Sequence, residues 1–160
     1  MRPSLKRPSL MPPSMSRVGA GLVVALLLAL AGCGDPTEDY CSDLKEHSKQ
    51  IADMIGSGSP AALLSGLPML RDLADKSPED LADEWQAFIG ALDGLDQAIK
   101  DAGVKPGDFK GGNPPAGLSA TDRKAIADAA GQITTEEVVQ ASSGIEQEAR
   151  DVCKVNLGLA

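Results

Sequence analysis

The chain has 160 residues, of which 42% are hydrophobic and only 2% aromatic, and its formal net charge at pH 7 is −8. This length suits a single domain, and a core built from alanine, leucine, isoleucine and valine favours helices over strands. The excess of acidic residues argues against nucleic acid or anionic lipid headgroups as partners, because both would be repelled.

The first 32 residues have the pattern of an export signal. A basic lead rich in proline and serine precedes an apolar stretch over 18–31, and no acidic residue occurs before Asp35. A transmembrane helix needs about 18 or more apolar residues, so this stretch better suits the hydrophobic region of a signal peptide. Met15 is an alternative start, which would leave a signal of conventional length.

The sequence Leu30-Ala31-Gly32-Cys33 ends this segment and resembles the lipobox of bacterial lipoprotein precursors. The resemblance implies that diacylglycerol is attached to the Cys33 sulfur, that cleavage occurs before Cys33, and that the product is anchored on the extracytoplasmic face of the cell membrane. The alternative is an ordinary signal peptide or an uncleaved anchor. We expect a signal peptide over 1–32, a lipidated tether over 33–35 and a helical domain over 36–160.

If Cys33 carries lipid, two cysteines remain, Cys41 and Cys153. An even number of cysteines in an exported protein predicts a disulfide, which would join the first and last helices of the domain. A redox-active or metal-binding pair is the alternative. It would lack Cys-x-x-Cys spacing, and the chain has one histidine to offer as a further ligand.

Two helices are expected in the first half of the domain. The first is predicted over about 36–55, because Asp35 and Pro36 form a typical helix start and apolar residues then recur at spacings of three and four. The second follows a glycine- and serine-rich break, and Gly66 and Pro68 within it predict a kink or a split. The apolar positions are Cys41, Leu44, Ile51 and Ile55 in the first helix and Leu63, Leu64, Leu67, Leu70 and Leu73 in the second.

A third helix over about 77–102 is predicted to be central. Its apolar residues alternate steps of four and three without interruption, and a neighbouring flank of small residues predicts close approach of another helix. The apolar residues are Leu81, Trp85, Phe88, Leu92, Leu95 and Ile99, and the small ones are Ala87, Ala91, Gly94 and Ala98.

A glycine- and proline-rich loop is expected over 103–117, followed by a short helix to about 130 and a last helix that begins near Thr134. The sequence therefore predicts an all-α fold, a compact antiparallel bundle of four to five helices with one disulfide between the first and last. The buried stripe of the last helix is predicted to consist of Val138, Ser142, Ile145, Ala149 and Val152.

The helical part is similar to small helical lipoproteins of high-GC Gram-positive bacteria. The matching residues are Tyr40-Cys41, Trp85 with the preceding Ser77-Pro78-Glu79-Asp80, and Cys153. This resemblance implies the fold and the location, and it transfers no active site.

Few residues suggest catalysis or metal binding. His47 could act as a base or ligand, or it could be structural. The acidic group Glu79, Asp80, Asp83 and Glu84 could bind a divalent cation, but it occupies the first turns of a helix, where the helix dipole favours negative charge. We therefore expect no enzyme activity, no cofactor and no metal site.

Trp85 and Phe109 are the candidate contacts for a ligand or partner. Trp85 either gates a pocket or belongs to the core, and Phe109, between Lys105 and Lys110, either contacts a partner or lipid surface or lies in a connector. The leading hypothesis is a membrane-anchored, non-enzymatic module that binds an envelope protein or wall component. The alternative is a carrier of a small apolar ligand, held between the second and third helices under the Phe109 loop.

Overall fold

The computed structural model describes residues 36–110 and 113–159, and this part of the chain is helical and contains no strand. The predicted all-α class is confirmed. The predicted signal peptide, the tether and the lipobox with Cys33 lie outside the described residues. The helices are α1 (Pro36–Gly56), α2 (Pro60–Asp75), η1 (Glu79–Leu81), α3 (Ala82–Asp101), η2 (Pro106–Asp108), α4 (Ala120–Gln132) and α5 (Glu136–Asp151).

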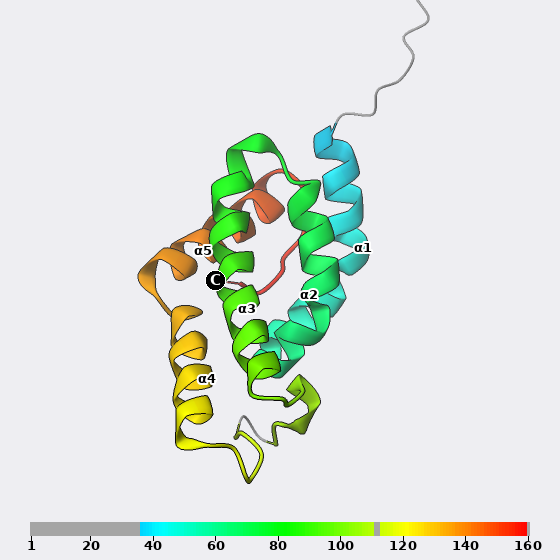
Figure 1. Ribbon diagram of the computed structural model, residues 1–160. Helices are drawn as coiled ribbons and strands as arrows, with labels where there is room; N and C mark the ends of the chain where they lie inside the picture. The colour runs from blue at the N-terminus through cyan, green and yellow to red at the C-terminus, as the bar shows by residue number, and fades with distance from the viewer. Residues whose placement is uncertain (1–35, 111–112, 160) are drawn as a thin grey trace, which may run out of the picture. The chain divides into compact units, whose positions relative to one another are not determined.

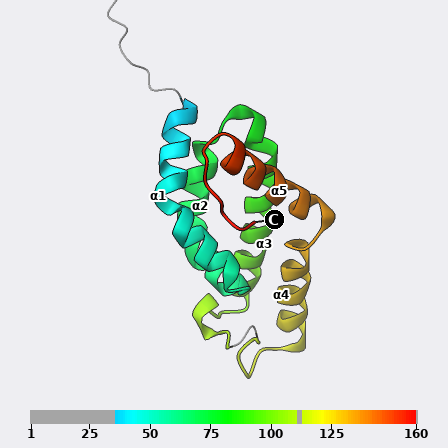
Figure 2. The same ribbon diagram turned by 180° about the vertical axis from the view of Figure 1, so that it is seen from behind.

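The bundle is organised around α3. Helices α1, α2 and α3 run in alternating directions and are joined by short turns (Figure 1). Helix α3 packs against α2, α4 and α5, while α1 packs mainly against α2. Seen from behind, α5 lies across the face of α3 that α2 leaves free (Figure 2). The prediction of a central third helix is confirmed.

The core follows the apolar stripe of α3. All six residues predicted to form it are buried, and the Trp85 and Phe88 rings meet edge to face with their centroids 6.2 Å apart. Leu81 belongs to the short helix η1, which precedes α3 directly. A stripe with steps of three and four turns one side of the helix inward, so these residues share a single apolar cluster.

Helix α2 is continuous through Pro68, so of the two predicted alternatives, a kink or a split, the split is excluded. Pro68 is exposed, so its missing N–H weakens only the solvent-facing side of the helix, while four leucines of α2 stay buried against the core. Gly66 serves a different purpose, since a Cβ atom there would collide with the Met54 Sδ of α1. The missing side chain therefore leaves room for the Met54 side chain against α2.

The predicted disulfide between Cys41 and Cys153 is confirmed. Cys41 lies early in α1, Cys153 follows the end of α5, and their Cα atoms are 4.9 Å apart. Both residues are buried. The bond thereby joins the two ends of the helical part, which are 112 residues apart in sequence.

After α5 the chain turns back over the bundle as a C-terminal segment, residues 152–159 (Figure 2). Lys154 adopts a positive φ of 61°, and Leu157 is fully buried. The prediction that Val152 belongs to the buried stripe is wrong: its side chain is 47% exposed, because α5 ends at Asp151 and the stripe ends with it.

Candidate functional site

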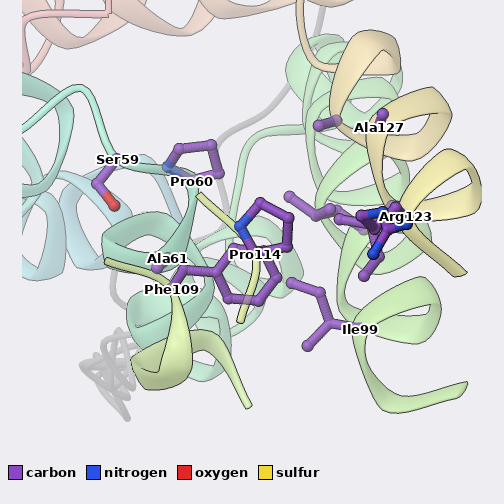
Figure 3. A pocket seen from close by; sticks show the side chains of 11 residues that line it. Ser59, Pro60, Ala61, Ile99, Phe109, Pro114, Arg123 and Ala127 are labelled. Atoms are coloured by element: carbon purple, nitrogen blue, oxygen red, sulfur yellow. The ribbon is translucent and has the colours of Figure 1, made fainter. Parts of the chain in front are cut away.

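An apolar cavity of about 160 Å³ lies at the end of the bundle where α1 ends and α2 begins. Four segments that are distant in sequence surround it: the start of α2, the last turns of α3, the loop after α3, and α4 (Figure 3). The lining residues are Ser59, Pro60, Ala61, Leu95, Ile99, Phe109, Pro114, Arg123, Ile126, Ala127 and Ala130.

The loop that carries Phe109 is locally ordered. The Lys105 N–H donates to Asp108 Oδ2 at 2.9 Å, the Phe109 N–H donates to the Pro106 carbonyl at 3.3 Å, and Lys110 and Asn113 exchange two backbone hydrogen bonds. These bonds fix the backbone on both sides of Phe109. The ring is half-buried, packs against the core cluster and faces the cavity (Figure 3).

Arg123 stands across the cavity from Phe109 (Figure 3). The Ser119 hydroxyl caps α4 by accepting the Asp122 N–H at 3.0 Å, which confirms the predicted start of this helix and places Arg123 in its first turns. One guanidinium nitrogen of Arg123 donates to the Leu118 carbonyl at 2.5 Å. Arg123 is the one charged residue among those that line the cavity.

Our sequence interpretation missed Arg123, although one signal was present. A cation near the start of a helix opposes the helix dipole, which favours negative charge there. The structure gives Arg123 two surroundings that the sequence pattern did not indicate, the Leu118 carbonyl and the cavity.

Of the two aromatic residues predicted to contact a ligand, the structure brings only Phe109 to this cavity. Trp85 is 2% exposed and its Nε1 donates to the Tyr40 hydroxyl at 3.1 Å. Burial raises the pKa of Tyr40 to about 12. The structure therefore places Trp85 and Tyr40 together in the core.

The other predicted candidates lie apart from the cavity. His47 is half-buried on α1, and its side chain makes no hydrogen bond or ion pair with the described residues. Asp83 and Glu84 line an open hollow with Glu136 and Glu137 of α5. Within 36–110 and 113–159, no group of three or more histidine, cysteine, aspartate or glutamate side chains is arranged to hold a metal ion.

The chain matches no protein-family model, no curated protein and no solved structure. Among the described helices, none has the length and apolar character needed to cross a bilayer. Chemically, the cavity offers apolar surface, one guanidinium group and the Ser59 hydroxyl. These groups can pack against and hydrogen-bond a small ligand.

Proposed function

We propose that this chain is a lipid-anchored, extracytoplasmic, non-enzymatic protein that binds a small apolar group in the cavity beside Phe109. The resemblance of Leu30-Ala31-Gly32-Cys33 to a lipobox supports the anchor, and the Cys41–Cys153 disulfide is compatible with an exported protein. One observation carries the binding function: Phe109 and Arg123 face each other across an apolar cavity of about 160 Å³ (Figure 3). Ser59 and Pro60, which line this cavity, follow the end of α1, whereas the proposed tether precedes its first residue, Pro36.

This arrangement separates the anchor from the ligand. Only two residues lie between Cys33 and Pro36, so the tether reaches about 10 Å at most. Helix α1 has 21 residues and is therefore about 30 Å long, and Ser59 follows shortly after its end. The attachment point at Cys33 and the cavity are therefore about one helix length apart along α1. We assign Phe109 to ligand contact because its ring faces the cavity.

The size of the cavity restricts what it can bind. An apolar cavity of about 150 Å³ accommodates benzene, whereas sites for drug-sized molecules measure about 300 to 1,000 Å³. At about 160 Å³, the cavity admits one ring or a short branched chain.

The anchor is tested by the intact mass of the protein extracted from membranes without reducing agent. We expect a chain that lacks residues 1–32, carries acyl chains on Cys33 and has lost two hydrogens to the cystine. A Cys33→Ser chain, as the control, should carry no lipid. A native chain with its first 32 residues still attached would contradict the proposed anchor.

Binding is tested with the full chain in lipid nanodiscs and two fluorinated probes, 3-(4-fluorophenyl)propionate and the corresponding neutral propanol. Broadening of the ¹⁹F NMR signal reports a bound ring. The Ala127→Trp substitution fills the cavity, and Ala125→Trp places the same side chain at an exposed position of α4 that does not line it.

We expect at least one probe to bind the native chain and the Ala125→Trp chain but not the Ala127→Trp chain. Equal binding by both variants would contradict this site. If neither probe binds, but an envelope protein co-purifies with the native and Ala125→Trp chains and not with Ala127→Trp, the occupant is a side chain of a partner protein.

A further inference from the structure

We propose that the ligand is a small apolar carboxylate, with its ring or branched end in the cavity and its carboxylate on Arg123. This inference rests on the proposed binding function and names the class of ligand.

Arg123 is exposed, and most of its N–H donors are left to solvent rather than to groups of the protein. A guanidinium group has five N–H donors, and the described residues give this one the Leu118 carbonyl as its acceptor. The other two described arginines each form an ion pair with a carboxylate: Arg71 pairs with Asp93, and Arg150 pairs with Glu146. The planar guanidinium group of Arg123 suits bidentate contact with a carboxylate, but it has no carboxylate partner among the described residues.

The surrounding charge also favours an anion. After the first 34 residues the chain contains 11 basic and 23 acidic residues, a formal net charge of −12. Residues 103–127 reverse this balance with four cations and two carboxylates, and both carboxylates are engaged locally: Asp108 with the Lys105 N–H and Asp122 with the Ser119 hydroxyl. Lys124 pairs with Asp128, so Lys105, Lys110 and Arg123 remain as the cations of this stretch, and Arg123 is the one that lines the cavity. The stretch is thus less acidic than the rest of the domain, which favours an anionic ligand beside Arg123.

The cavity restricts the rest of the ligand to apolar groups. Leu95, Ile99 and Ile126 contribute to its walls and are each at most 6% exposed. A second charge buried among these three side chains would lose its hydrogen bonds to water, and they offer no polar group to replace them. These residues therefore accommodate a ligand that has one carboxylate at the cavity entrance and one apolar end inside the cavity.

The test compares the two fluorinated probes, which share a ring and a chain length and differ in the carboxylate. In the native chain we expect the propionate to bind about tenfold more tightly than the propanol, since a hydrogen bond to a charged group is typically worth about that factor. Arg123→Gln should abolish this preference while propanol binding persists, which would show that the cavity remains formed. Arg123→Lys should retain part of the preference.

Lys124→Gln provides the matched control, because Lys124 is the next residue, does not line the cavity and pairs with Asp128. It should leave the preference intact. Equal affinities for the two probes, or a preference that survives in Arg123→Gln, would overturn the carboxylate assignment and leave the proposed binding function standing. If neither probe binds the native chain, both the carboxylate assignment and the binding of a small ligand would be overturned.

Discussion

At the scale of single residues, Glu146 holds the C-terminal segment in place. This carboxylate is 1% exposed, and its Oε2 accepts the N–H groups of Leu157 at 3.0 Å and Leu159 at 3.2 Å. Its Oε1 has no hydrogen-bond partner among the described residues, although Arg150 Nε lies 3.7 Å away. A buried acceptor of two backbone donors links the last turns of α5 to the segment that returns over them.

Glu146→Ala should therefore lower the free energy of unfolding by about 2 to 4 kcal/mol, because two backbone N–H groups lose their acceptor. Glu146→Gln retains one acceptor oxygen and should cost less. Urea denaturation measures the stability, and hydrogen exchange at the Leu157 amide should accelerate before global unfolding. Gln147→Ala, at the exposed neighbouring position, serves as control. Protection of Leu157 that persists in Glu146→Ala would refute the link.

Because Tyr40 is buried, we predict that the free energy of unfolding falls at high pH. Its folded-state pKa is raised by burial to about 12, whereas an unfolded tyrosine titrates near 10. Both states hold the proton below pH 10, and only the folded state holds it between 10 and 12, so unfolding becomes easier across this window. The contribution that is lost is about 2 to 3 kcal/mol.

Tyr40→Phe provides the reference for this effect. It should be less stable at neutral pH by about 1 to 3 kcal/mol, because the Trp85 Nε1 loses its acceptor. The difference in unfolding free energy between the two chains should then shrink as the pH rises from 10 to 12. Since the chain has one tyrosine, absorbance near 295 nm reports its ionisation directly. A difference that stays constant with pH would contradict the raised pKa.

The sequence predicted the buried residues of α3 but not the role of Glu146. A regular spacing of apolar residues needs only a helix to become a buried face, whereas a buried carboxylate depends on a segment that returns from outside the helix. The prediction for Val152 fails because the apolar periodicity of the sequence continues through this residue, whereas the helix ends at Asp151.

At the scale of elements, the small residues of the helices have different surroundings. Of the α3 flank predicted for close approach, Ala91 and Ala98 pack against the core cluster, whereas at Gly94 no atom of another segment lies within 4 Å of the place that a Cβ atom would take. At Gly66 a Cβ atom would collide with Met54. Sequence spacing identifies small residues on a helix face, but it does not identify which of them a neighbour approaches.

Gly94→Ala should raise the free energy of unfolding by about 0.5 to 1 kcal/mol, because alanine loses less conformational entropy than glycine in an open helical position. Gly66→Ala has the same helical advantage but displaces the Met54 side chain, so it should be at least about 1 kcal/mol less stable than Gly94→Ala. Thermal and urea denaturation compare the two chains. A Gly66→Ala chain as stable as Gly94→Ala would show that Met54 moves aside without cost.

Helix α4 shows why the site was predicted only in part. It has one buried residue, Ile126, so its own pattern says little about where it packs. The Ser119 cap fixes where it starts, and the turns around Phe109 fix how the chain reaches it. The proximity of Arg123 to Phe109 and Pro60 follows from this connection rather than from any motif.

At the scale of the whole molecule, the disulfide encloses nearly all of the helical part. The bond closes a loop with a sequence separation of 112 residues, which in the chain-entropy model stabilises the folded state by about 4 to 5 kcal/mol. The double substitution Cys41→Ser with Cys153→Ser should lower the free energy of unfolding by about this amount. Cys33→Ser, measured alongside, should leave it unchanged. Equal urea midpoints for all three chains would contradict this role.

The position of Cys153 and Leu157 also determines when folding can finish. A chain that crosses a membrane with its amino end leading delivers Tyr40 and Cys41 early, yet the residues that bond to and cover this region emerge more than a hundred positions later. If the chain is exported as we propose, the early helices therefore lack their disulfide partner during passage. In that case the disulfide closes the bundle only after the segment that follows α5 has reached the oxidising side.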